Sequence, residues 1–66
     1  MNPRQYSLCK YVGRPSAGVF LEKDTYVFLG EIPNMPGHCV VLNHRTGKLY
    51  SGYHTDNFIE LTEDEV

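Results

Sequence analysis

The sequence has no tryptophan, only two cysteines, and no apolar run near the ~20 residues that a membrane-spanning helix needs. Its net charge is only −2, which argues against a dedicated nucleic-acid-binding protein. No Asn-x-Ser/Thr acceptor occurs, and residues 1–6 lead into no apolar segment of a signal peptide. These absences predict a cytoplasmic protein with two reduced thiols, Cys9 and Cys39, and with no membrane partner.

A chain of 66 residues has room for one small domain, which we take as residues 1–66. A domain of this size buries only about 60% of its unfolded surface, so apolar burial and the cost of ordering the chain nearly balance. The fold must therefore be compact, cross-linked or dimeric. A large multi-step active site has no room here.

The charges are unevenly distributed along the chain. Residues 1–21 carry three cations and no acid, whereas residues 60–66 carry four acids and no cation. We interpret the two regions as a basic edge and a solvated acidic tail. Residues 62–66 are expected to fray, because a helix begun at Thr62 would hold only one turn.

Glycine and proline, ten residues together, divide the chain into pieces too short for helices. β-Branched and apolar residues between them predict five short strands, at residues 6–12, 25–29, 38–42, 48–53 and 58–61. Irregular chain is expected at residues 33–37, where two prolines occur, and a hairpin loop at residues 43–47.

Local chemistry predicts several backbone details. Gly37 and Gly47 are placed where a turn needs a positive φ, and Gly52 within its strand indicates a bulge. Residues 54–57 predict a single 3₁₀ turn capped by Thr55 or Asp56. Simple alternation in the strand before it places one set of side chains on one face (Tyr50, Gly52, His54) and the other set opposite (Leu49, Ser51, Tyr53).

Five short strands with turns between them predict an all-β fold, a small five-stranded barrel or roll, because closure removes exposed edges. The expected core consists of Val19, Leu21, Val27, Leu29, Cys39, Val41, Leu49, Phe58 and Ile59. A register shift of one residue would instead bury Phe28, Val40 and Tyr50.

The segment Lys48–Leu61, KLYSGYHTDNFIEL, resembles the corresponding part of an SH3-like barrel. Members of that family have a glycine-containing strand, a 3₁₀ turn that ends in an aromatic residue (here Phe58), and a short closing strand. The resemblance covers roughly residues 19–61, and the chain is also similar to small bacterial and prophage-encoded proteins of this barrel type. The family's tryptophan pair and its acidic first strand are absent here.

Among the potential metal ligands, one pair is at the edge of zinc-site spacing, because five residues separate His38 from His44. His38 and His44 flank a strand, and His38 and Cys39 are adjacent, so they point to opposite faces. No spacing joins a cysteine to an activating base, and no Gly-x-Ser-x-Gly motif occurs. We therefore expect no metal, no cofactor and no enzymatic activity.

The sequence favours a non-catalytic module that binds a protein or peptide, or a second copy of itself through an edge strand. In an SH3-like barrel the return strand and the 3₁₀ turn border the ligand groove. The residues there combine apolar bodies with polar tips: Tyr50, Tyr53, His54, Asp56 and Asn57. The alternative is weak nucleic-acid binding through aromatic and basic residues near the amino terminus: Tyr6, Lys10, Tyr11 and Arg14.

Overall fold

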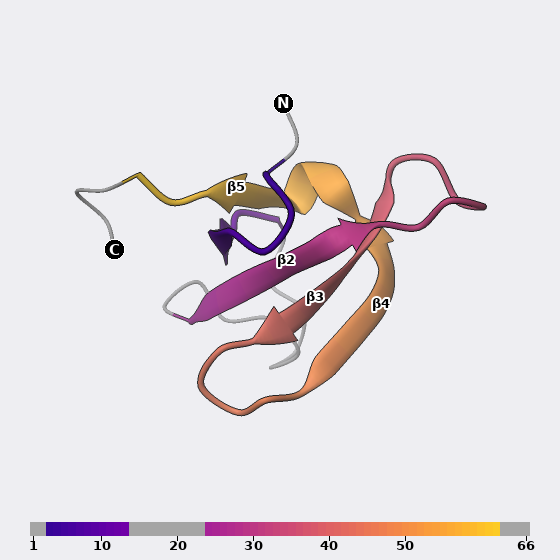
Figure 1. Cartoon of the computed structure of the whole chain (residues 1–66). Helices are drawn as coiled ribbons and strands as arrows, with labels where there is room; N and C mark the ends of the chain where they lie inside the picture. Colours follow the sequence, from indigo (N-terminus) through magenta and orange to yellow (C-terminus); the bar gives the residue numbers. More distant parts are fainter. Residues whose placement is uncertain (1–2, 14–23, 63–66) are drawn as a thin grey trace.

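The computed structural model describes residues 3–13 and 24–62 of the chain, and these ranges form an all-β structure (Figure 1). Its elements in chain order are β1 (Leu8–Tyr11), β2 (Thr25–Glu31), β3 (His38–Asn43), β4 (Leu49–His54), the 3₁₀ turn η1 (Thr55–Asn57) and β5 (Phe58–Glu60). The predicted fold class, with five short strands and one 3₁₀ turn before the last, is confirmed. The described ranges contain no helix of the length and apolarity that a membrane crossing requires.

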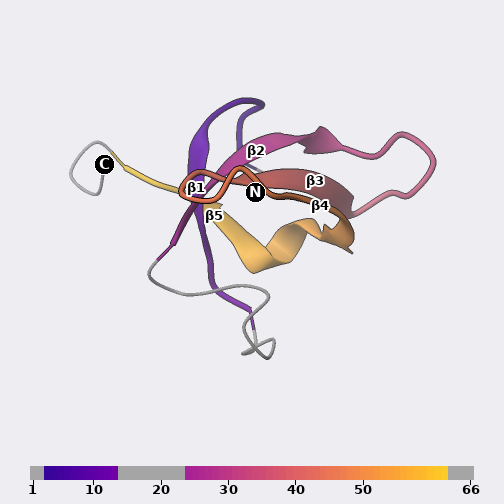
Figure 2. The same ribbon diagram turned by 90° about the horizontal axis from the view of Figure 1, so that it is seen from below.

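The five strands form one antiparallel sheet in the order β4-β3-β2-β1-β5. Within the described ranges β4 and β5 pair with no partner on their outer sides, so the sheet is not closed. Of the predicted barrel or roll, the barrel is therefore not confirmed. All three residues of β5 pair with β1 alone. Figure 2 shows β2, β3 and β4 as a curved layer, with η1 and β5 beneath it.

The core fills the space between that layer and η1–β5. Its residues are Cys9, Tyr11, Tyr26, Phe28, Cys39, Val41 and Phe58, and Tyr50 packs against them. Phe58 makes edge-to-face contacts with Tyr11 and Tyr26, with ring centroids 5.6 and 5.8 Å apart, an arrangement that aromatic pairs prefer. The burial of Cys39, Val41 and Phe58 confirms that part of the predicted core.

The core prediction is wrong for Leu49 and Ile59, whose side chains are 60% and 49% exposed. Leu49 pairs with Leu42, on the face opposite the core, and Ile59 alternates with the buried Phe58. The alternative core, expected if the register shifts by one residue, is correct for Phe28, which is buried. Val27, Leu29 and Val40 are half-buried. Val19 and Leu21 lie outside the described residues.

A bulge at Gly52 reverses the direction of the side chains that follow it in β4. Cys39 pairs with Tyr53 and Val40 with Ser51, which leaves Gly52 as an extra residue with φ +84°. The predicted bulge is confirmed, and so are the positive φ values at Gly37 (+78°) and Gly47 (+77°).

Because of the extra residue, the simple alternation predicted for β4 is wrong. Tyr50 and Tyr53 pair with the buried Val41 and Cys39, so both tyrosines lie on the core side. The opposite side, called the outer face below, carries the remaining side chains of β4: Leu49, Ser51 and His54.

The predicted capping of the 3₁₀ turn by Thr55 or Asp56 is also wrong. Its N-cap is His54, which makes no side-chain capping bond, and Thr55 lies inside the turn and is buried. Backbone contacts hold the turn instead. The Thr55 N–H donates to the Gly37 carbonyl (2.8 Å), and the Asn57 carbonyl accepts from the Val12 N–H (2.7 Å).

Candidate functional site

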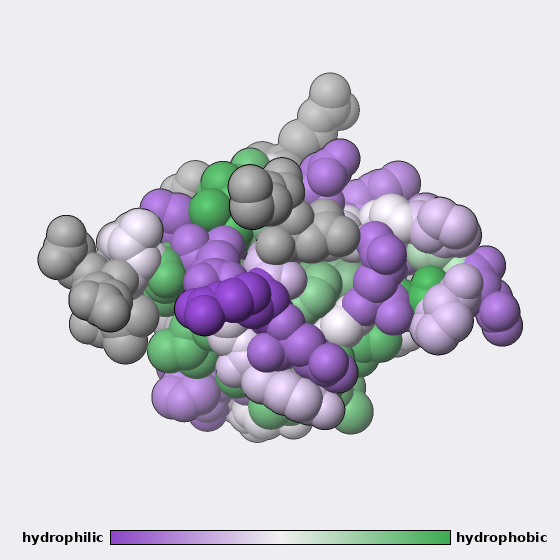
Figure 3. Space-filling model, turned by 45° about the horizontal axis from the view of Figure 1, so that its top comes forward, coloured by the Kyte–Doolittle hydropathy of each residue, from purple (hydrophilic) through white to green (hydrophobic). Residues whose placement is uncertain are grey.

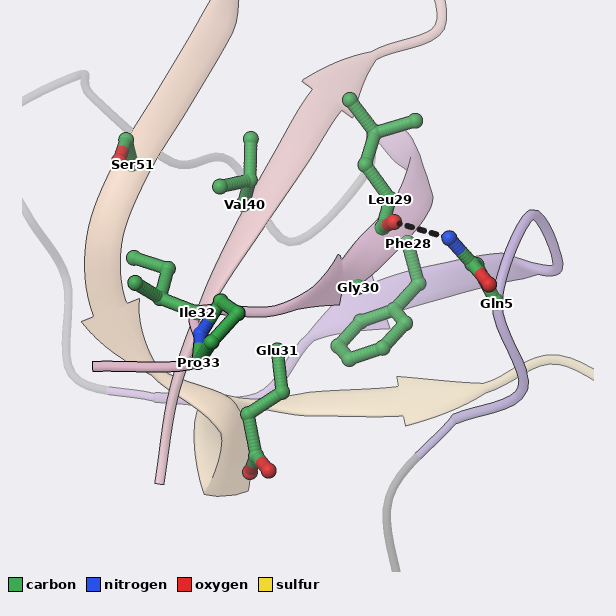
Figure 4. Close-up of a pocket in the computed structure, with 9 residues that line it drawn as sticks. All are labelled: Gln5, Phe28, Leu29, Gly30, Glu31, Ile32, Pro33, Val40 and Ser51. Atoms are coloured by element: carbon green, nitrogen blue, oxygen red, sulfur yellow. Dashed lines mark hydrogen bonds between the residues drawn. The ribbon is translucent and has the colours of Figure 1, made fainter. Parts of the chain in front are cut away.

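An open groove of about 670 Å³ lies on the sheet around the end of β2 (Figure 4). The residues that line it come from the start of the chain, from β2 and the turn after it, from β3 and from β4: Gln5, Phe28, Leu29, Gly30, Glu31, Ile32, Pro33, Val40 and Ser51. None of them belongs to either group of binding residues predicted from the sequence.

A second bulge builds this groove. The register between β2 and β3 shifts between Phe28 and Gly30, so Leu29 is the extra residue. Gly30 has φ +136°, a conformation that residues with a side chain rarely adopt. Figure 4 shows Leu29 and Val40 pointing to one side of the sheet and Phe28 to the other.

Polar contacts hold two of the residues that line the groove. The Gln5 side-chain amide donates to the Leu29 carbonyl at 3.1 Å (Figure 4). Glu31 accepts from the Gly37 N–H through Oε2 at 3.3 Å. Glu31 is the one charged residue among those that line the groove, and Figure 4 shows its side chain pointing away from Leu29 and Val40. The lining is therefore mainly apolar, a composition common in ligand sites.

The structure divides the binding cluster predicted at the return strand. Tyr50 and Tyr53 lie together, with ring centroids 6.1 Å apart, and the Lys48 ammonium lies 5.5 Å from the Tyr50 ring centroid. His54 is on the outer face, away from both rings. Asp56 is exposed in η1, and Asn57 is half-buried.

Of the described residues in the nucleic-acid alternative, Tyr11 is not on the surface. Tyr6 is 71% exposed, whereas Tyr11 is 6% exposed and packs in the core, where a base cannot stack on it. Lys10 is half-buried. Arg14 lies outside the described residues.

Both cysteines are buried and neither forms a disulfide. Burial, together with smaller effects of the neighbouring Cys39 and Glu60, raises the pKa of the Cys9 thiol to about 12. Burial also raises the pKa of the Cys39 thiol, and the nearby Thr55 side chain opposes that shift. Thiols in this state are poor nucleophiles, because the thiolate is the reactive form.

The described residues on the face drawn in Figure 3 form no single dominant apolar area. On the face drawn in Figure 3, hydrophobic side chains alternate with hydrophilic ones, and a strongly hydrophilic strip crosses its middle. Scattered apolar residues of this kind are normal on a protein surface. We take the groove as the candidate site because it is concave and brings together residues from β2, β3, β4 and the start of the chain.

One feature of the sequence indicates this groove. Gly30 follows a strand that is apolar on both faces, and a glycine inside a strand pattern indicates a bulge or a close backbone approach. Which side chains from β3, β4 and the start of the chain surround that bulge depends on the register of three strands, which no local pattern gives.

Comparisons of the chain with protein-family models, with curated proteins and with solved structures found no match.

Proposed function

We propose that this protein is a non-catalytic module that binds a protein or peptide, and that an extended segment of the partner occupies the groove around Gly30. The observation that carries this proposal is the groove itself, with about 670 Å³ of space between mainly apolar walls. The walls suit an apolar side chain, and the bulged backbone at Gly30 lets another chain approach closely.

The SH3-like resemblance remains part of the proposal. Support comes from the β3–β4 hairpin, the 3₁₀ turn after β4 and the aromatic Phe58 that follows it. The raised pKa values of both thiols and their burial support a role without covalent catalysis. A second copy of the chain is one partner of this class, and β4 offers it an unpaired edge among the described strands.

The test is selection of a random peptide library on the full chain, followed by titration of the selected peptides into ¹⁵N-labelled protein. We expect the shifted amide signals to cluster at Leu29, Gly30 and Val40. Val40→Glu places a charge on the groove wall while the core side of β3 is unchanged, and it should weaken binding by more than about tenfold, or ~1.4 kcal/mol.

Tyr53→Ala is the matched variant for the cluster predicted from the sequence, and it should bind the same peptides as the unmodified protein does. Unchanged binding by Val40→Glu, or loss of binding in Tyr53→Ala alone, would contradict the groove assignment. Failure to select any peptide would contradict the peptide-binding proposal. Sedimentation of the protein alone shows whether a second copy is the partner.

A further inference from the structure

Two of the three histidines meet across strands β3 and β4. His38 and His54 are directly opposite each other in the register, and their ring centroids lie 4.5 Å apart with an interplanar angle of 37°. In the sequence, the histidine pair nearest to zinc-site spacing is a different one, His38 and His44. The outer face thus carries two imidazoles side by side, next to Val40 and Ser51 of the groove.

A backbone contact determines which nitrogen of His38 carries a proton. Nδ1 lies 3.1 Å from the Pro36 carbonyl oxygen. A carbonyl only accepts, so Nδ1–H is the donor, and in the neutral ring Nε2 keeps its lone pair. Histidines that bind metals typically donate their other ring N–H to a carbonyl or carboxylate in this way.

The backbone around both rings is held in place by contacts between the elements that carry them. The Thr55 N–H, next to His54, donates to the carbonyl of Gly37, next to His38, at 2.8 Å. The His38 N–H donates to the Met35 carbonyl at 3.0 Å. A site whose supporting backbone is fixed loses less entropy when a ligand binds.

We propose that His38 and His54 form a two-histidine site for a divalent late transition-metal ion such as Zn²⁺ or Ni²⁺. Imidazole suits these ions, and nitrogens about 2.0–2.1 Å from one zinc ion lie no more than ~4 Å apart. Binding therefore requires the exposed His54 side chain to rotate while His38 keeps its Nδ1 contact with Pro36. Within the described residues no group of three or more metal-ligating side chains occurs, so water completes the coordination.

The site is distinct in chemistry from the peptide groove that it borders. The groove's described lining is mainly apolar, whereas the pair offers two imidazole nitrogen ligands at the edge of the sheet. Half-buried His38 and exposed His54 leave the metal accessible to water. The proposal does not depend on peptide binding, and each can fail alone.

Isothermal titration of ZnCl₂ and NiCl₂ into the untagged full chain tests the proposal. We expect one ion per chain, with affinity reduced by more than about tenfold in His38→Ala and in His54→Ala. His44→Ala is the matched control, because His44 is exposed in the β3–β4 loop, and it should bind within about twofold of the unmodified protein.

Long-range ¹H–¹⁵N spectra of the histidine rings give a second readout that a general loss of stability would not produce. On addition of Zn²⁺ the Nε2 signal of His38 should move, while Nδ1 keeps the shift of a protonated nitrogen. The proposal is overturned if no ion binds, if both His38→Ala and His54→Ala bind normally, or if His44→Ala loses binding equally.

Discussion

Glu60 ties the start of the chain to its last strand. Its carboxylate accepts the Arg4 N–H at 2.8 Å and the Arg4 guanidinium at 2.8 to 3.2 Å. The hydrogen bond from Arg4 is the largest cause that lowers the pKa of Glu60 below its ordinary 4.5, and the same pair raises the pKa of Arg4. Both side chains are at least partly exposed, so the ion pair adds little to the free energy of unfolding. Its main effects are to hold the start of the chain near β5 and to favour the ionised form of Glu60.

Arg4→Ala should raise the pKa of Glu60 toward 4.5, because the largest cause of its depression is removed. In the unmodified protein the ionised carboxylate adds stability above that pH, and the contribution is lost as pH falls through the lowered folded-state value. Carboxyl ¹³C shifts against pH measure the first effect, and urea unfolding at several pH values measures the second. Lys48→Ala, which removes another exposed cation, should leave the Glu60 titration unchanged, and equal titration in Arg4→Ala would contradict the assignment.

At the scale of the elements, two glycine bulges decide what each face of the sheet carries. The bulge in β2 opens the groove at Gly30, and the bulge in β4 brings Tyr50 and Tyr53 to the core side. Both glycines have positive φ values, +136° and +84°. One extra residue in a strand reverses the alternation of all side chains beyond it, so each bulge acts well past its own position.

Gly52→Ala should destabilise the protein by about 1–2 kcal/mol, because a residue with a Cβ is strained at positive φ. The effect is conformational and not steric, since a Cβ built at Gly52 meets nothing within 4 Å. Urea unfolding measures it, with Ser51→Ala as the control, which should change stability by no more than about 0.5 kcal/mol. Equal unfolding midpoints for the two variants would count against the bulge as the cause.

For the whole molecule, one small aromatic core carries the stability. Phe58 is 2% exposed and touches the rings of Tyr11 and Tyr26, which come from β1 and β2. Phe58 thereby connects β5 to β1 and β2 through contacts inside the core. A chain of this length has a total stability of about 3–10 kcal/mol at typical values per residue.

Phe58→Ala should cost about 3–5 kcal/mol and leave a large unfolded fraction at room temperature. The neighbouring Ile59→Ala changes a side chain that is 49% exposed and should cost less than about 1 kcal/mol. Far-ultraviolet circular dichroism during thermal unfolding compares the two. If Ile59→Ala were the more damaging change, the register of β5 in this structure would be wrong.

The sequence by itself determined the elements, because their causes are local. Proline and glycine ended the strands, and Gly37, Gly47 and Gly52 adopt the positive φ values that turn and bulge chemistry requires. The 3₁₀ turn and the buried Phe58 behind it also followed from short-range pattern. All five predicted strands occur within a few residues of their expected bounds.

Only the tertiary structure decided the face of each side chain, the edges of the sheet and the neighbours across it. The sequence predicts Leu49 and Ile59 in the core, but both are exposed. Alternation along a strand does not reveal which of two apolar faces is buried. The groove at Gly30 and the His38–His54 pair depend on register between strands. Register is a property of the assembled sheet, since its free energy comes from contacts between residues distant in sequence.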